Sequence, residues 1–217
     1  MKKIRLSLIF LLTVTPSWMA WPTWAGGYKA RPWTINERTA YPATLTSEGV
    51  TIAAEPLFSD ALAERVFDKS DMITRGIMPL ALIIFNDNNF PIEVDGLSID
   101  LIHDSEHVRT LSPNEVVYRL FRNDRSWFSK TVLPRIPRSE LNEDALADFE
   151  SKFLMDKIVE PHSKGGGFLY LHMNSNELVS YLTKSVVYIP NVYRRDNGSR
   201  MIFFEIGLER AIPAGSH

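Results

Sequence analysis

The longest hydrophobic run after the first 25 residues covers 77–85, with the sequence IMPLALIIF, and ends at an asparagine-rich turn over 86–89. A run of this length bounded by turn residues predicts a central β-strand buried on both faces. Leu97, Ile99 and Leu101 alternate with polar residues, which predicts a strand with one inward face. Other runs that predict strands are 49–54, 92–94, 108–111, 168–172, 185–192 and 201–208.

Glycine-containing turns connect several of these runs. Asp196-Asn197-Gly198-Ser199 separates the runs 185–192 and 201–208, and Asn-Gly is favoured at the centre of a type I′ turn. We therefore expect a β-hairpin with a type I′ turn at this position. The three glycines at 165–167 predict a flexible entry into the strand 168–172.

Two segments have the pattern of α-helices. Ser112-Pro113-Asn114-Glu115 combines a serine N-cap, a proline at the first helical position and the glutamate of a capping box. Apolar residues at helical spacing, including Phe149, predict a second helix over 141–159. The acidic and basic residues of that helix, among them Asp148 and Lys152, are expected mostly on its solvent side.

The distribution of these elements indicates a mainly β, α+β fold. Strands at both ends with helices between them favour an antiparallel immunoglobulin-like β-sandwich over 49–210, because the strand–helix alternation of a parallel sheet is missing. The helical insertion covers about 112–160 and is expected to pack over one edge or end of the sandwich. Residues 26–48 read as a linker or loosely docked arm, and 211–217 as a flexible tail.

The N-terminus has the pattern of a signal peptide over residues 1–25. Lys2, Lys3 and Arg5 precede an apolar run at 6–14, which is much shorter than the roughly 20 residues needed to span a bilayer. The run is therefore typical of a secretory leader, and it predicts a periplasmic or secreted protein.

Thr23-Trp24-Ala25 supplies small residues at the two positions that signal peptidase reads, so cleavage is expected after Ala25. The alternative is an uncleaved leader that anchors the protein in the membrane. Trp18, Trp21 and Trp24 would then form an interfacial aromatic belt.

The amino-acid composition restricts which classes of function this chain can have. The chain has 24 Lys and Arg and 26 Asp and Glu. The leader holds three of the basic residues and none of the acidic ones, which leaves 21 against 26 and a formal charge of −5. This acidic balance argues against nucleic acid binding, which depends on a basic surface. The absence of cysteine excludes disulfides, zinc–thiolate sites and thiol nucleophiles.

His103 and His107 are the sharpest candidate for chemistry. They lie across a short turn with Asp104 and Glu106, and imidazole with carboxylate oxygens suits zinc or another divalent metal. His162 or His172 would be the source of a third imidazole. The competing interpretation is a polar, solvated hairpin tip. No other cofactor is predicted.

Trp127 and Phe128 form an aromatic pair in a polar segment. They predict either a contact with a sugar ring or a protein partner, or a plug in the core beneath a crossing loop. The chain has no Gly-x-Ser-x-Gly motif, and the glycines at 165–167 lack the Lys-Ser/Thr of a phosphate loop.

Three segments taken together carry a resemblance to a known group of proteins. They are GVTIAAEP at 49–56, the strand 76–86 with its asparagine-rich turn, and GFLY at 167–170 followed by the closing FFEI at 203–206. Their order resembles uncharacterised exported bacterial proteins built around an immunoglobulin-like sandwich. The resemblance implies a fold and an exported location, and it implies no activity. The helical stretch 112–160 departs from a minimal sandwich.

The leading hypothesis is a non-enzymatic envelope protein, in which a β-sandwich binds an envelope protein or a glycan as an accessory module. The alternative is a periplasmic metal-dependent hydrolase that uses a divalent metal at His103 and His107. Membrane association is expected only if the leader stays uncleaved.

The leader generates the first testable prediction. Mass spectrometry of the protein recovered from the periplasm or medium of an expressing bacterium should give a chain that begins at Gly26, because the small residues before that position fit the peptidase. An intact N-terminus in the membrane fraction would show the anchor instead.

Overall fold

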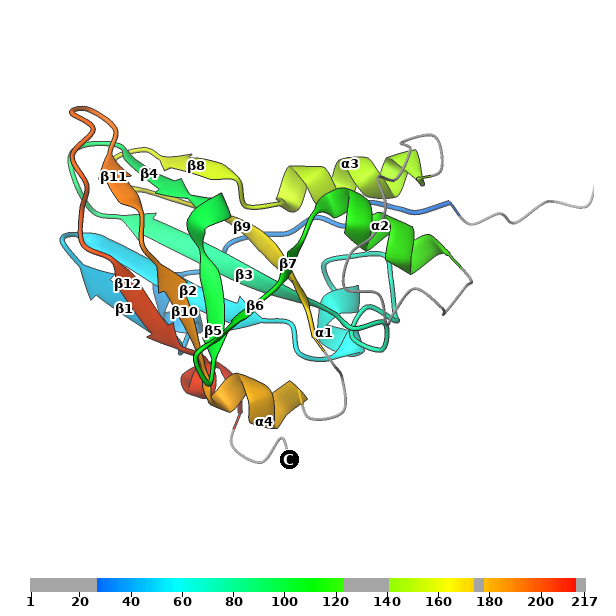
Figure 1. The fold of residues 1–217 in the computed structure, drawn as a ribbon. Helices are drawn as coiled ribbons and strands as arrows, with labels where there is room; N and C mark the ends of the chain where they lie inside the picture. Colours follow the sequence, from blue (N-terminus) through cyan, green and yellow to red (C-terminus); the bar gives the residue numbers. More distant parts are fainter. Residues whose placement is uncertain (1–26, 123–140, 174–177, 214–217) are drawn as a thin grey trace, which may run out of the picture.

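The computed structural model describes residues 27–122, 141–173 and 178–213, and its strands form three antiparallel sheets (Figure 1). The five-stranded sheet has the order β1 (Thr44–Ser47), β2 (Val50–Pro56), β3 (Ile77–Asn86), β9 (Ser163–His172) and β7 (Thr110–Leu111). The four-stranded sheet has the order β12 (Phe204–Gly207), β10 (Ser185–Ile189), β5 (Asp100–His103) and β6 (Glu106–Val108). The three-stranded sheet has the order β11 (Val192–Arg194), β4 (Ile92–Asp95) and β8 (Asp156–Val159).

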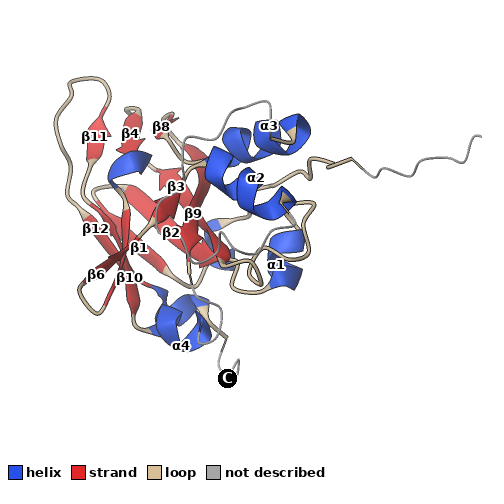
Figure 2. Ribbon diagram, turned by 45° about the vertical axis from the view of Figure 1, so that its right-hand side comes forward, coloured by secondary structure: helices blue, strands red, loops and turns tan. Residues whose placement is uncertain are grey.

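The helices lie on one side of the five-stranded sheet, except for α4. Figure 2 shows α1, α2 and α3 together, with α4 apart beside β10. Their bounds are α1 (Asp60–Glu64), α2 (Pro113–Phe121), α3 (Glu143–Lys152) and α4 (Leu178–Thr183), and the short 3-10 turns are η1 (Arg38–Ala40), η2 (Gly96–Ser98) and η6 (Leu208–Ala211). Within the described ranges, no helix has the length and apolarity that a bilayer span requires.

The strand β3 is the centre of the fold, as its hydrophobic run predicts. All ten of its residues are buried, and it pairs with β2 on one side and β9 on the other. Successive side chains alternate between the two faces of a strand, so β3 contributes to two separate hydrophobic clusters. Leu80 and Leu82 belong to the first cluster, whereas Ala81 and Ile83 belong to the second.

The two clusters place the five-stranded sheet in the middle of three layers. The first cluster joins its inner face to residues of the two smaller sheets, such as Leu101 of the four-stranded sheet and Val94 of the three-stranded sheet. The second joins its other face to α2, α3 and the N-terminal arm, through residues such as Val116 and Phe149. The insertion was expected over an edge or end of a sandwich. Its helices instead pack on a face of the five-stranded sheet, which they share with the arm, because β3 is apolar on both faces.

The three glycines at 165–167 lie inside β9 and not in a flexible entry before it. Each of them allows a close approach. A Cβ at Gly166 would collide with the Leu82 carbonyl oxygen and lie 3.2 Å from the Trp33 ring. A Cβ at Gly167 would lie 3.0 Å from the Lys152 carbonyl oxygen. The glycines therefore let the chain that follows α3 and the indole of Trp33 pack directly on β9.

The second predicted helix is shorter than its apolar spacing suggested. The Asn142 side chain caps it at its start, and it ends at Lys152. Residues 156–159 form β8 and pair with β4 instead. The capping box at Ser112 and Glu115, in contrast, is confirmed in both directions.

The predicted closing hairpin is partly confirmed. The strands β10 and β12 pair, with Val187 opposite Ile206. The chain between them leaves to form β11 on another sheet, and only Gly198 in its turn has positive φ, whereas a type I′ turn needs two such residues. The two-residue turn at Asp104 and Ser105, both with positive φ, has that backbone instead.

The position of Leu97 also differs from the prediction. It was expected on the inward face with Ile99 and Leu101, which are buried. Leu97 is 68% exposed because residues 96–98 form η2, so the period of two begins only after it.

The arm over residues 27–43 lies against the domain. Tyr28, Tyr41 and Ala43 are buried, and Trp33 packs on Phe168 with ring centroids 4.6 Å apart. These contacts hold the arm across the helical side of β9.

The packing at β9 predicts a strong effect of a single methyl group. Gly166→Ala should lower the free energy of unfolding by about 1–3 kcal/mol, because the added carbon meets backbone that cannot move away. Urea denaturation measures the change. Gly207→Ala is the matched control in β12, where a Cβ would meet nothing within 4 Å, and it should leave stability nearly unchanged. Equal effects of the two variants would contradict the proposed close packing.

Candidate functional site

A groove runs between the N-terminal arm, α3 and β9, with a cavity volume of about 690 Å³. We call it the arm groove. One wall is the arm, the other is the last turn of α3, and the floor is β9 with a side chain from β8. The residues that line it are Arg31, Pro32, Trp33, Thr34, Ile35, Asp148, Ser151, Lys152, Lys157, Lys164, Gly165 and Gly166.

At the floor of the groove, β9 contributes two glycines and therefore no side chains of its own. Gly165 and Gly166 expose the backbone of β9, and Trp33 approaches that backbone with the edge of its ring. Lys157 extends over Gly165, where its Cε would be 3.2 Å from an added Cβ. The glycines thus create both the depth of the groove and the seat of the indole ring.

A buried polar trio holds the arm at one end of the groove. The Lys152 ammonium lies 2.7 Å from both carboxylate oxygens of Asp148, and it also donates to the Val66 carbonyl at 2.9 Å. The Tyr28 hydroxyl donates to Asp148 at 2.6 Å. Asp148, Lys152 and Tyr28 are all at least nine-tenths buried. A second hollow of about 540 Å³ lies on the other side of Asp148, beside Tyr28 and Asp144.

The Tyr28 hydroxyl of the trio keeps its proton. Burial, with the hydrogen bond to Asp148, raises the pKa of the Tyr28 hydroxyl far above its usual range. Asp148 accepts hydrogen bonds on both oxygens, so it has little capacity left for a substrate proton. A general base needs to reach the proton that it removes. The trio therefore positions the arm and does not have the arrangement of a catalytic acid–base pair.

Cations predominate around the groove. Arg31 pairs with Asp68 at 2.9 Å and Lys164 pairs with Glu37 at 3.1 Å, both near the surface. Lys157 has no ion pair with any residue that the structure describes. With Lys152 neutralised by Asp148, the groove offers at least one uncompensated ammonium group to a ligand.

The structure does not bring His103 and His107 together. In the antiparallel register His103 lies opposite Glu106, and Ile102 lies opposite His107, so the two imidazoles are on opposite faces of the sheet. His103 stacks on Tyr181 at 3.5 Å and contacts Ser185, whereas His107 lies 3.2 Å from Asp100. Within the described ranges, no three His, Asp or Glu side chains are placed to share a metal ion.

The other predicted site residues are also dispersed. Trp127 and Phe128 lie outside the described residues, so their role stays a prediction. His162, one possible third imidazole, bonds to Asn89 at 2.8 Å. His172, the other, contacts Arg119 at the end of α2.

The sequence contained a signal for the buried trio, and assigning the charged residues of the helix to its solvent side missed it. Asp148 and Lys152 were expected mostly on the wet side of their helix, and this was wrong. They follow Ala145 at spacings of three and seven residues, and residues at that spacing share one face of a helix. The four-residue separation of the acid and the base also allows them to pair on that face.

No protein-family model matches the chain, and no curated protein matches it. Among solved structures, the chain is similar to the YjhA protein of Bacillus subtilis, with a TM-score of 0.35, 8% identity and coverage of 69% of this chain and 78% of that one. A putative lipoprotein, YcdA, of Bacillus subtilis has a TM-score of 0.38 and 8% identity over 77% of this chain and 39% of that one. Neither TM-score reaches 0.5, so these similarities carry no argument about function.

The trio predicts a large penalty when one charge is removed. Asp148→Asn should lower the free energy of unfolding by about 3–5 kcal/mol, because the buried Lys152 loses its counter-charge. The double variant Asp148→Asn with Lys152→Met removes both charges and keeps an oxygen acceptor for Tyr28. It should recover most of that loss in urea denaturation. A double variant as unstable as the single one would show that the ion pair is not the cause.

Proposed function

We propose that this protein is an exported, non-enzymatic envelope module that binds an acidic glycan in the arm groove. The observation that carries the proposal is a groove with a glycine floor that holds a lysine, Lys157, without an ion pair to any described residue. Export is proposed from the leader at residues 1–25, and an immunoglobulin-like relationship of the sandwich is proposed from the strand pattern. The antiparallel β-rich fold is compatible with both.

The charge of the groove supports an anionic ligand. Lys157 is available without breaking an ion pair, and Arg31 and Lys164 stand at the rim with partially exposed side chains. A carboxylate bound at the floor would accept from Lys157, and charge-assisted hydrogen bonds are the stronger kind.

The shape of the groove supports a polymer of sugar rings. The arm on one side, the glycines of β9 on the floor and a half-buried indole leave a cavity of about 690 Å³ that has room for sugar rings. Aromatic side chains with an apolar face and a polar edge are well suited to such contacts. A second class of function, a metal-dependent hydrolase at His103 and His107, gains no support from a register that separates the two rings.

Binding of an oligogalacturonate to the purified exported chain tests the proposal. Isothermal titration calorimetry should show binding that weakens by about tenfold or more in Lys157→Gln with Lys164→Gln, since about 1.4 kcal/mol of lost interaction corresponds to tenfold. Lys184→Gln, which removes an exposed lysine between α4 and β10 that does not line the groove, is the control and should bind as the wild type does.

Two outcomes would contradict this function. Equal weakening by Lys184→Gln would indicate attraction by overall charge. Equal affinity for a neutral cello-oligosaccharide, or for poly-glutamate, would exclude an acidic glycan as the preferred ligand.

A further inference from the structure

Arg119, on the C-terminal half of α2, is a buried arginine with unfilled hydrogen-bonding capacity. It is only 3% exposed, and its Nη1 lies 3.3 Å from Nδ1 of His172. Its Nε and Nη2 are buried and have no hydrogen-bond partner among the described residues. A buried charged group without partners costs several kcal/mol, so these two nitrogens call for an explanation.

The two unfilled nitrogens are on the same edge of the guanidinium. Nε–H and the adjacent Nη2–H run parallel, and this pair of donors matches the two oxygens of a carboxylate or a phosphate. Nη1, the remaining nitrogen, is the one that contacts His172. The unfilled capacity therefore has the form of one complete bidentate site.

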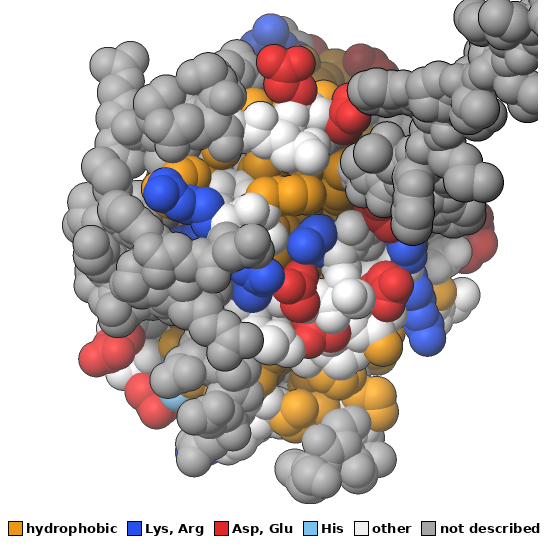
Figure 3. All heavy atoms as spheres, turned by 90° about the vertical axis from the view of Figure 1, so that its right-hand side faces the viewer, with side chains coloured by type: hydrophobic (Ala, Val, Ile, Leu, Met, Phe, Trp, Pro, Cys, Tyr) orange, Lys and Arg blue, Asp and Glu red, His pale blue; other side chains and the backbone are white. Residues whose placement is uncertain are grey.

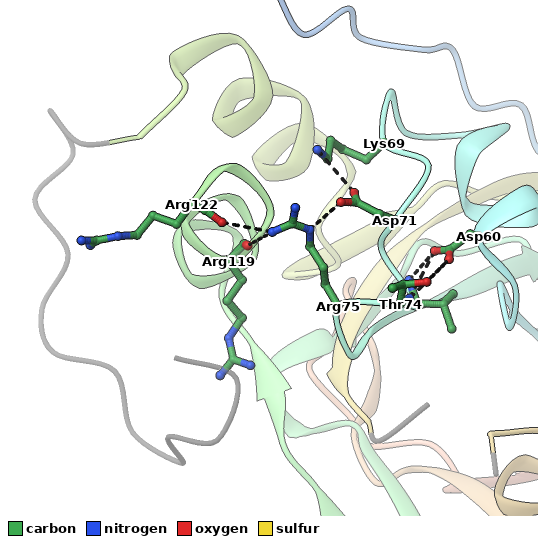
Figure 4. A network of polar contacts seen from close by, with 8 residues as sticks. Asp60, Lys69, Asp71, Thr74, Arg75, Arg119 and Arg122 are labelled. Atoms are coloured by element: carbon green, nitrogen blue, oxygen red, sulfur yellow. Dashed lines mark hydrogen bonds and ion pairs between the residues drawn. The ribbon is translucent and has the colours of Figure 1, made fainter. Parts of the chain in front are cut away.

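The neighbouring carboxylates are committed to other groups. Glu115 accepts from Arg109 and from the backbone of Ser112, as the capping box requires. Asp71 pairs with Arg75 through Oδ2, and its Oδ1 accepts no hydrogen bond but lies 3.4 Å from the Lys69 ammonium. Figure 4 shows that the Arg119 guanidinium extends away from Arg75 and Asp71.

The Arg75 guanidinium, like the carboxylates, is already engaged in other hydrogen bonds. It donates to the carbonyl oxygens of Arg119 and Arg122 at 3.1 Å each, which satisfies the C-terminal end of α2. Figure 3 shows that Lys and Arg side chains alternate with Asp and Glu on this end of the molecule. Arg75 is thus held in place by contacts other than the Arg119 guanidinium.

His172 fixes the orientation of the guanidinium. Burial and the charge of Arg119 lower the pKa of His172, so its ring is neutral near pH 7. A neutral ring can accept from Arg119 through Nδ1 while Nε2 carries the proton. The nearby Gly76 carbonyl already accepts from the Met173 backbone, so it does not need the Nδ1 proton.

We propose that the Nε and Nη2 edge of Arg119 binds one oxyanion, a carboxylate or a phosphate, at a site separate from the arm groove. Arg109 and Glu115 both lie near enough to act on Arg119, and they pair with each other, so the charge left for a ligand is that of Arg119 itself. Inorganic phosphate, acetate and the acidic end of a larger ligand all offer the same pair of oxygens.

Thermal unfolding of the full exported chain in phosphate, acetate and chloride at equal ionic strength tests the site. A ligand that binds only the folded state raises the Tm with its concentration. We expect phosphate or acetate to raise the Tm above its value in chloride, and to do so progressively as the anion replaces chloride. The difference between phosphate and acetate distinguishes a tetrahedral from a planar ligand.

Two variants distinguish binding by the paired donors of Arg119 from attraction by positive charge alone. Arg119→Lys keeps the positive charge and removes the paired donors, so the anion-specific rise in Tm should disappear. Arg195→Lys, at an exposed arginine paired with Glu93, is the matched control and should retain it. Lys157→Gln should also retain it, so a failure of the arm groove as a glycan site would leave this result unchanged.

A measurement on the wild-type protein tests the site even if Arg119→Lys fails to fold. In ¹⁵N NMR the Nε–H signal of Arg119 should shift on titration with the anion that raises the Tm. Equal Tm values in all three salts would overturn the proposal, as would a rise that persists in Arg119→Lys or an Nε–H signal that does not move. If another part of the chain already fills the Nε and Nη2 edge, the Tm values in the three salts will be equal.

Discussion

The strand β3 is apolar on both faces, and the rest of the fold follows from the need to cover both. Burying its ten residues requires a layer on each side of the five-stranded sheet. The two smaller sheets cover one face, and α2, α3 and the arm cover the other. Because hydrophobic burial is the dominant favourable term in folding, a helical layer over this face is as necessary as the sandwich itself.

The helical layer is also where the unusual charges are found. Asp148 and Lys152 on α3 and Arg119 on α2 are three of the few buried charged residues in the described part of the chain. The first two neutralise each other and hold Tyr28 of the arm. Among the described residues, the Arg119 guanidinium contacts only the neutral ring of His172 as a hydrogen-bond partner. Charges at this depth are costly unless paired, so the contrast between the two sites separates an anchoring role from a binding role.

The glycines of β9 connect the fold to the groove. Residues 165–167 carry no side chains on a strand whose later residues are large and buried, including Phe168 and Tyr170. Their absence of side chains lets Trp33 and the end of α3 approach the sheet, and the same absence leaves a floor for the arm groove. One sequence feature thus determines how the arm docks and where a ligand has room.

The sequence by itself determined the central strand, the capping box at Ser112 and the antiparallel β-rich class, because these depend on local hydrophobic period and on hydrogen bonds a few residues apart. It also contained the spacing that puts Asp148 on the buried face of its helix. Only the tertiary structure decided that residues 156–159 leave the helix for β4, that His103 and His107 face opposite sides, and that Arg119 keeps an open pair of donors. These features depend on strand register and on contacts between segments far apart in the chain, and neither is encoded in the local pattern of hydrophobic and polar residues.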